Sequence, residues 1–332
     1  MSRLLSTVSA ITFIAGTYAN ADVPKVVADI APIHSLVSRV MDGVGEPKLI
    51  VPNETSPHEY RLRPADAEAI ENANLVFWMG EGLTPWMERA LEALSNDTDI
   101  IEFLALEEST LLSFREGALF EAHDHSDHDD HDDHDDHDKD HDDHDDHDDH
   151  DDHDDHAGHD HGEYDPHAWL STNNAKTWLN VIAARLSSID PDNAGAYFAN
   201  ASEARGEMDA LDVEINTMLD PVRGGKFVVF HDAYQYFETV YDFPASGAIS
   251  LGDASDPSAA RVAEIANRIK SENIACVLSE PQFNAGLVKT VMGGTDATTE
   301  VIDPLGFGIE PGKSLYPKLI RAMAQSLVNC LK

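Results

Sequence analysis

The chain has 332 residues, of which 62 are Asp or Glu and 22 are Lys or Arg, and its formal net charge at pH 7 is −40. Such an acidic protein is a poor partner for nucleic acid or for anionic lipid, because both carry negative charge themselves. The length is sufficient for two domains of ordinary size, each with its own hydrophobic core.

The first 21 residues have the features of a cleaved secretory signal peptide. One early basic residue, Arg3, precedes a short apolar stretch over residues 4–15, and small residues stand at Ala19 and Ala21. We therefore expect cleavage before Asp22 and a periplasmic mature protein, the alternative being a buried N-terminal helix. No Cys stands directly after the expected cleavage site to carry a lipid anchor, and no later run has the roughly 20 apolar residues of a spanning helix. The mature protein is thus expected not to insert into a membrane.

Short apolar runs alternate with helix-like stretches between the signal peptide and residue 103. Strands are predicted over residues 25–30, 48–51, 75–79 and 99–103, with helices over 33–44, 64–72 and 85–94 between them. This alternation is typical of an α/β unit whose sheet is mainly parallel.

The segment 123–161 is a low-complexity tract made largely of a repeated His-Asp-Asp triplet. It contains 21 Asp and 14 His, and Ala157 is its one apolar residue. It cannot bury a core, and like charges repel along it, so we predict a disordered loop. Much of the acidity is here, because residues 121–163 carry a charge of −22 and leave −18 for the rest of the chain.

Histidine at every third position of this tract is not needed for solubility. Imidazoles and carboxylates on a mobile chain are predicted to bind several transition-metal ions weakly, in competition with protons. We expect an auxiliary segment that collects or senses zinc, the alternative being a merely solvated acidic tract. Its histidines are His123, His125, His128, His131, His134, His137, His141, His144, His147, His150, His153, His156, His159 and His161.

A helix over residues 174–188 is predicted to join two domains. Trp178, Ile182 and Leu186 recur there at helical spacing, and the Asp-Pro step at 190–191 ends the pattern. A further helix is predicted over 193–218. The expected organisation is a signal peptide over 1–21, an N-terminal lobe over 22–170, a linking helix over 171–189 and a C-terminal lobe over 190–332.

The second half repeats the α/β pattern of the first. Strands are predicted over residues 226–230, 245–249, 275–278 and 300–302, with helices over 257–271 and 286–292. The predicted fold class is therefore α/β, with two lobes that each contain a mainly parallel four-stranded sheet flanked by helices.

Cys276 and Cys330 are the two cysteines of the chain. In an exported protein an even pair is more often bridged than free, so we expect one disulfide that ties a strand to the C-terminal helix. A two-cysteine metal site is the alternative, and the lack of CxxC spacing disfavours it.

Four histidines lie outside the tract, and three of them follow predicted strands. His58 comes after the second strand, His167 after the fourth strand and the tract, and His231 directly after the fifth. Asp303 directly follows the last strand. Ligands of open α/β sheets bind outside the carboxyl ends of the strands, so we expect these residues to converge on one cleft between the lobes. The fourth histidine, His34, lies in the first predicted helix and is interpreted as structural or as a neighbour of a ligand.

Three imidazoles and one carboxylate form a set suited to tetrahedral Zn²⁺, whereas Mn²⁺ favours more carboxylates. A closed set of protein ligands fits capture better than catalysis, since a catalytic zinc keeps one position open for water. If Asp303 does not bind, Glu59 or water is the alternative fourth ligand. A zinc hydrolase therefore stays a rival, although no HExxH motif supplies a general base. Taken singly, each residue also fits a plain turn or hydrogen-bonding role.

Five motifs link the chain to a known family. They are PHEYRLRPADAEAIENANLVFWMG, DPHAWLS, FHDAYQYF, LSEPQFN and DPLG, with the His-rich insert between the first two. In this order, and over essentially the whole mature chain, they resemble the ZnuA-type, zinc-binding members of the periplasmic solute-binding proteins that serve metal-ion ABC importers. The resemblance implies two α/β lobes joined by a long rigid helix, with metal held in the cleft by His58, His167 and His231. It also implies Asp303 as a fourth ligand or near-ligand, with Glu59 as an alternative.

The resemblance carries further expectations about partners and specificity. It implies that Cys276 pairs with Cys330, and that His231 favours zinc, because manganese-type relatives usually have a carboxylate there. The implied function is high-affinity capture of Zn²⁺ in the periplasm and delivery to the membrane permease of an ABC importer, by a monomeric protein that is not an enzyme. The alternatives are a zinc buffer or surface adhesin and, less favoured, a zinc hydrolase. The insert departs from the family in its length and its near-regular triplet.

Overall fold

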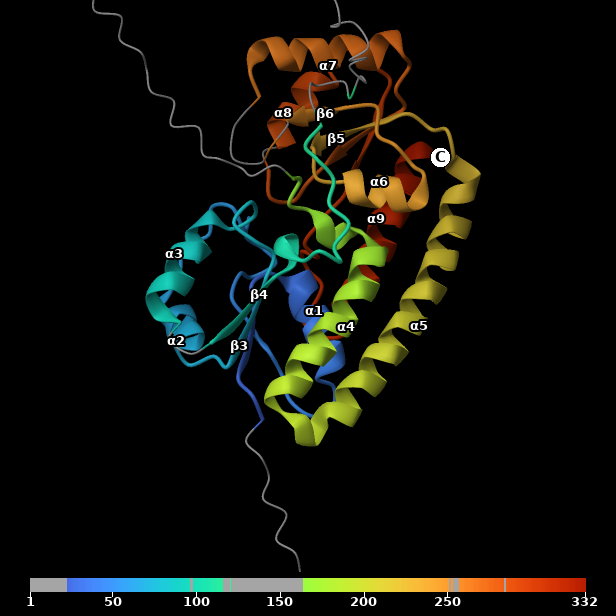
Figure 1. The fold of residues 1–332 in the computed structure, drawn as a ribbon. Helices are drawn as coiled ribbons and strands as arrows, with labels where there is room; N and C mark the ends of the chain where they lie inside the picture. The colour runs from blue at the N-terminus through green and yellow to red at the C-terminus, as the bar shows by residue number, and fades with distance from the viewer. Residues whose placement is uncertain are drawn as a thin grey trace, which may run out of the picture.

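The computed structural model describes residues 23–95, 98–115, 120, 164–250, 252, 257–283 and 285–332. The predicted signal peptide and the tract over 123–161 lie outside these residues. Within them the chain forms two α/β lobes, one above the other in Figure 1, with helices running along one side of both.

The first lobe is built on a four-stranded parallel sheet. Its strand order is β2-β1-β3-β4, with β1 (Val26–Ala28), β2 (Lys48–Leu49), β3 (Leu75–Trp78) and β4 (Asp99–Glu102). The inner strands β1 and β3 are buried at every residue, as expected for a parallel sheet covered on both faces. The helices of this part of the chain are α1 (Ala31–Val40), α2 (Pro64–Glu71) and α3 (Pro85–Leu94).

The second lobe repeats this arrangement. Its parallel sheet has the order β6-β5-β7-β8, with β5 (Phe227–His231), β6 (Ala248–Ser250), β7 (Cys276–Ser279) and β8 (Thr298–Val301). The helices are α6 (Gln235–Tyr241), α7 (Ala259–Ser271), α8 (Ala285–Val291) and α9 (Leu315–Leu331). The predicted fold class is confirmed, and most strand boundaries differ from the predicted ones by one to three residues.

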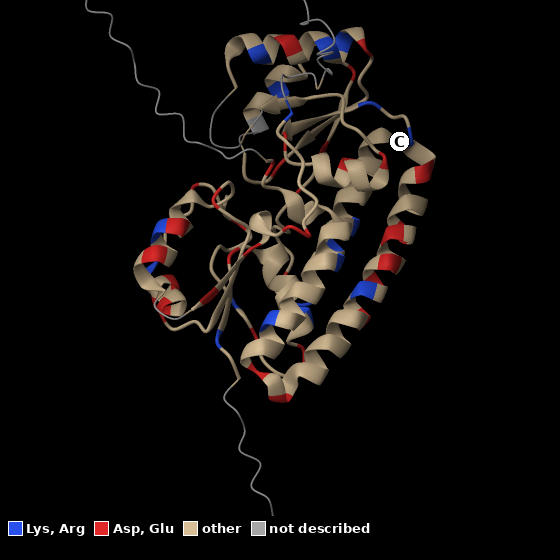
Figure 2. Cartoon of the chain, in the orientation of Figure 1, with Lys and Arg blue, Asp and Glu red and all other residues tan. Residues whose placement is uncertain are grey.

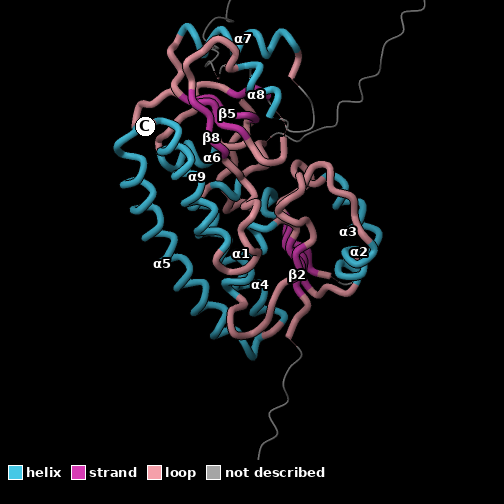
Figure 3. Tube along the Cα trace, turned by 180° about the vertical axis from the view of Figure 1, so that it is seen from behind, coloured by secondary structure: helices cyan, strands magenta, loops and turns pink. Residues whose placement is uncertain are grey.

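Two helices connect the lobes as an antiparallel pair, α4 (Thr172–Ile189) and α5 (Ala194–Leu219). The helix predicted over 174–188 is α4, which leads away from the region between the lobes, and the longer α5 returns to the second lobe (Figures 1 and 3). The short 3-10 turn Pro191–Asn193 reverses the chain between them. The long helix between the lobes is therefore α5, and α4 packs beside it.

The sequence of α5 explains this packing. Its buried residues recur every three or four positions and form one apolar seam, at Tyr197, Ala201, Ala204, Met208, Leu211, Ile215 and Leu219. The outer face carries exposed acidic residues, whose positions along the helix are red in Figure 2. The seam belongs to one hydrophobic core that runs through both lobes. Any movement of one lobe against the other must therefore act on a shared core.

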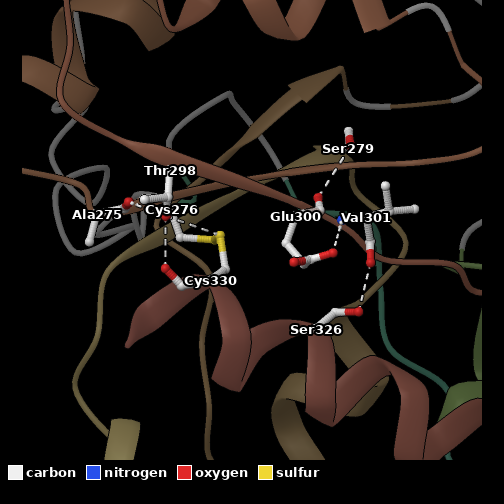
Figure 4. Close-up of a disulfide and its surroundings, with 8 residues drawn as sticks. All are labelled: Ala275, Cys276, Ser279, Thr298, Glu300, Val301, Ser326 and Cys330. Carbon is white, nitrogen blue, oxygen red and sulfur yellow. Dashed lines mark hydrogen bonds between the residues drawn. A yellow bond between two sulfur atoms is a disulfide. The ribbon is translucent and has the colours of Figure 1, made fainter.

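The predicted disulfide is present. Cys276 of β7 is bonded to Cys330 of α9, with the two Cα atoms 5.5 Å apart, and Thr298 Oγ1 donates a hydrogen bond to the Cys330 carbonyl at 2.8 Å (Figure 4). The bridge ties a strand to the C-terminal helix, as the sequence indicated. None of the helices within the described residues is long and apolar enough to cross a membrane.

Candidate metal centre

A small cavity lies between the lobes and is lined from both of them. Its volume is about 20 Å³, which is enough for one water molecule or one ion. The lining residues are Ser56, Pro57, His58, His167, His231, Glu280, Gln282, Phe283, Pro304 and Leu305. The structure thus brings together the three histidines that the sequence singled out.

The turn that carries His167 is held by hydrogen bonds on either side. His167 immediately precedes the 3-10 turn Ala168–Leu170, and the Ser171 hydroxyl caps α4 by accepting from Asn174 N at 3.2 Å. Asn174 Nδ2 also donates to the Ala168 carbonyl at 3.1 Å. Because Trp169 Nε1 donates to the Pro304 carbonyl at 2.8 Å, this turn is joined to the opposite wall of the cavity.

His231 and His58 are held in different ways. His231 is the last residue of β5, where every residue is buried. His58 lies in the loop after β2, and this loop reaches the second lobe through Asn53, whose Nδ2 donates to the carbonyls of Gly306 and, at 2.8 Å, Ile309. Trp86 Nε1 donates to the Pro57 carbonyl at 2.8 Å on the other side. His231 is therefore held by a strand, and His58 by a loop that is fastened on both sides.

Two of the imidazoles already have the spacing of zinc ligands. The Nε2 atoms of His167 and His231 lie 3.4 Å apart. Two nitrogens that are each about 2.0–2.1 Å from a tetrahedral zinc are separated by about 3.4 Å. The ring centroid of His58 is 6.0 Å from that of His167. Among the residues that the structure describes, no three His, Cys, Asp or Glu side chains are close enough to hold an ion as they stand. A three-histidine site therefore requires His58 to move closer.

Each of these two imidazoles has a carboxylate on its other nitrogen. His167 Nδ1 contacts Asp165 Oδ1 at 2.7 Å, and His231 Nδ1 contacts Glu280 Oε1 at 2.7 Å. An ionised carboxylate only accepts, so each Nδ1 donates, and Nε2 is the ring nitrogen that can bind a metal ion. A cation between the two Nε2 atoms can be bound by both. Carboxylates placed in this way orient metal-binding histidines and increase their basicity.

The walls around the imidazoles are largely apolar. The Phe283 ring stacks on Phe230 at a centroid distance of 4.6 Å and lies 5.3 Å from the His231 ring. The Trp169 ring is 5.2 Å from that of His167. Apolar walls lower the local dielectric constant, and charge interactions are stronger where the dielectric constant is low.

Asp303 lies beside the cavity and does not line it. Its Oδ1 accepts hydrogen bonds from Gln282 Nε2 and Leu305 N, both at 3.0 Å, and its Oδ2 accepts one from Phe307 N. Burial raises the pKa of Tyr234 well above its ordinary value, and the negative charges of Glu280 and Asp303 raise it further. The Asp303 carboxylate is thus close to the centre but engaged in shaping its own turn, and its role as a fourth ligand stays a prediction.

The two remaining sequence candidates lie outside the cavity lining. Glu59 is exposed. His34 of α1 contacts the Pro47 carbonyl through Nε2 at 3.0 Å, and burial lowers its pKa. This geometry fits a structural histidine.

Sequence reasoning missed Asp165 and Glu280. Each had a signal in the chain, because Glu280 directly follows β7 and Asp165 stands two residues before His167. Strand-end position, the criterion that singled out Asp303, applies equally to Glu280.

Comparison with known proteins places the chain in a family. The family model described as zinc-uptake complex component A, periplasmic, matches residues 26–330. The chain belongs to this family. The high-affinity zinc uptake system protein ZnuA of Brucella abortus (strain 2308) is 49% identical over 306 residues, which cover 92% of this chain and 91% of that protein.

Solved structures show the same fold at lower identity. A crystal structure of ZnuA has a TM-score of 0.70 and 22% identity, and the match covers 94% of this chain and 100% of that one. The SBP FpvC from Pseudomonas aeruginosa in complex with Mn²⁺ also has a TM-score of 0.70, at 19% identity, with 93% of this chain and 99% of that one covered. Because zinc-uptake and manganese-bound proteins share the fold, the fold alone does not select the ion.

Proposed function

We propose that this protein captures Zn²⁺ in the periplasm and delivers it to the membrane permease of an ABC importer, and that it is not an enzyme. Membership of the zinc-uptake family supports the assignment. The observation that carries it is the pair of imidazoles from two separate segments, with Nε2 atoms 3.4 Å apart and a carboxylate on each Nδ1. This arrangement suits the reversible binding of a cation, because the carboxylates of Asp165 and Glu280 are engaged by the Nδ1 atoms of the two imidazoles.

The ligand set that we propose is His58, His167 and His231, with Asp303 or water in the fourth position. An entering Zn²⁺ exchanges its water for the Nε2 atoms of the last two residues, which are already at ligand spacing. Asp165 and Glu280 then stabilise the positive charge through the Nδ1–H groups. Approach of His58 from the other side completes the three imidazoles.

Several features outside the described residues belong to the same proposal. The signal peptide over 1–21 directs export, and the His-Asp tract over 123–161 collects or senses zinc near the cleft. A monomer suffices, because both lobes of one chain line the cavity.

Metal preference provides the direct test. A variant lacking residues 123–161 is titrated with Zn²⁺ and with Mn²⁺ in competition with a chelator, beside the protein that keeps the tract. We expect one tight site that prefers zinc, because three imidazoles and at most one carboxylate suit zinc better than manganese. Absence of a tight site, or equal affinity for manganese, would refute the proposed ligand set and favour storage in the tract.

Replacing Glu280 by Gln is expected to lower zinc affinity by about 10- to 100-fold, the usual cost of losing a carboxylate behind a metal-binding histidine. The amide keeps the size of the side chain and removes the charge that faces His231 Nδ1. Calorimetric or chelator-competition titration measures the change. Glu264→Gln is the matched control, since Glu264 of α7 is exposed outside the cavity lining and its replacement should leave the affinity unchanged. Equal affinities for the two variants would contradict the role of Glu280.

A further inference from the structure

Arg115, in the first half of the chain, is buried against the second lobe. The Arg115 guanidinium contacts both oxygens of Asp232, with Nε at 3.0 Å from each, and both oxygens of Glu238, at 2.7 and 3.1 Å. The Arg115 side chain is 15% exposed, and those of its two partners are 6% and 5% exposed. The Phe120 ring covers one face of the guanidinium, 3.6 Å from ring centroid to Cζ. Paired bidentate contacts of this kind fix geometry more strictly than a single ion pair.

A second contact joins the same segment to α6. Tyr236 Oη accepts a hydrogen bond from Leu112 N at 2.9 Å and donates one to the Asp165 carbonyl at 2.8 Å. Asp165 N in turn donates to the Leu112 carbonyl at 2.8 Å, and Ser113 pairs with Tyr164 in an antiparallel bridge. The segments 112–115 and 164–165 are thus paired with each other and fastened together to the second lobe.

These contacts lead directly to the two imidazoles at ligand spacing. Asp232 is the residue after His231, and Asp165 accepts the Nδ1–H of His167. The guanidinium fixes one of these neighbours and the Tyr236 hydroxyl fixes the other. The contacts that hold these two neighbours are made on the side of α6, and neither Arg115 nor Tyr236 lines the cavity.

We infer that Arg115, together with Tyr236, is a positioning residue that sets the spacing of His167 and His231 before metal arrives. The inference rests on the proposed zinc function. It adds an order of binding, in which His167 and His231 bind the ion first and His58 binds it afterwards. Holding His167 and His231 at this spacing in advance removes part of the entropic cost of ordering the two side chains when the ion binds. Arg115 and Tyr236 therefore increase the affinity although they do not contact the ion.

A change in the spacing of the two imidazoles must be distinguished from a failure to fold. Removing the Arg115 guanidinium alone would leave the carboxylates of Asp232 and Glu238 buried against each other. The neutral variant R115M/D232N/E238Q removes the ion pairs without leaving such charges. Tyr236→Phe removes a single oxygen. The matched control is K176M/D209N/D212N, since Lys176 also joins two carboxylates, at 3.0 Å each, but does so between α4 and α5.

Zinc affinity of the full mature chain is measured by chelator competition, and the visible spectrum with one equivalent of Co²⁺ reports on ligand geometry. We expect about a tenfold loss of affinity and an altered Co²⁺ spectrum for the neutral variant and for Tyr236→Phe, as for other residues that act behind metal ligands, and no more than a twofold change for the control. Thermal unfolding of the metal-free proteins establishes that each is folded. A folded Tyr236→Phe protein with the affinity and spectrum of the unmodified chain would overturn the inference. If the unmodified chain has no tight site, the proposed function fails first and the inference with it.

Discussion

Replacing His231 by Ala is expected to weaken zinc binding by about 100- to 1000-fold. Zinc held by four protein ligands is bound with roughly 10–16 kcal/mol, so one ligand accounts for about 2.5–4 kcal/mol, or two to three powers of ten. His231 ends a fully buried strand and lies at ligand spacing from His167. Its loss removes one of the two preset nitrogens, and no other histidine lines the second-lobe side of the cavity in the part of the chain that the structure describes.

Chelator competition on protein lacking residues 123–161 measures this loss without a background from the tract. His34→Gln is the control, since His34 contacts the Pro47 carbonyl and does not line the cavity. Its affinity should stay within about twofold of the unmodified protein, as for a residue without a role behind the ligands. Retention of tight binding by the His231→Ala protein would remove this residue from the ligand set, and the cleft would have to be assigned anew.

Removing the disulfide with C276A/C330A is expected to lower the free energy of unfolding by about 2–4 kcal/mol. The bridge joins residues 54 positions apart, and the segment that it closes carries Glu280, Phe283 and Leu305 of the cavity wall. Without the bridge the unfolded chain gains freedom, and this wall loses its link from β7 to α9. Alanine leaves no polar group in a site where Cys276 is fully buried.

Guanidinium unfolding of the metal-free protein measures the effect, and reduction of the unmodified protein should reproduce it. Saturating Zn²⁺ should recover part of the stability of both forms, because an ion that binds only the folded state stabilises it by mass action. An unfolding midpoint that is the same with and without the bridge would show that the C-terminal helix is held by packing alone.

The parallel sheets were predictable because their inner strands are continuous apolar runs. β1, β3 and β5 are buried at every residue, and such runs stand out in the sequence between helix-like stretches. The direction of the connecting helices was not predictable. Helical periodicity is the same in α4 and α5, and which of them returns to the second lobe depends on the reversal at Pro191–Asn193. The domain boundaries drawn from the sequence stay a prediction.

That three histidines line one cavity was predictable from the sequence, whereas the carboxylates that contact two of them were not. Parallel strands present their carboxyl ends at one edge of a sheet, so the strand ends indicate where His58, His167 and His231 meet. The positions of the carboxylates beside the imidazoles could not be predicted in this way. Asp165 and Glu280 act through the direction of a side chain toward a particular nitrogen, and residue order does not specify that direction. For the same reason, the sequence left open whether Asp303 faces the ion or only shapes the turn in which it lies.

The apolar walls formed by Phe283 and Leu305 have a consequence for the kinetics of the cargo. An ion inside leaves only when water or another ligand replaces the imidazoles, and a cavity of about 20 Å³ leaves little space beside the ion. We therefore expect slow dissociation from the closed form, so that competing chelators in solution cannot draw the ion out during diffusion. Release then requires a conformational change, and the rate at which the cavity walls separate sets the residence time of the zinc.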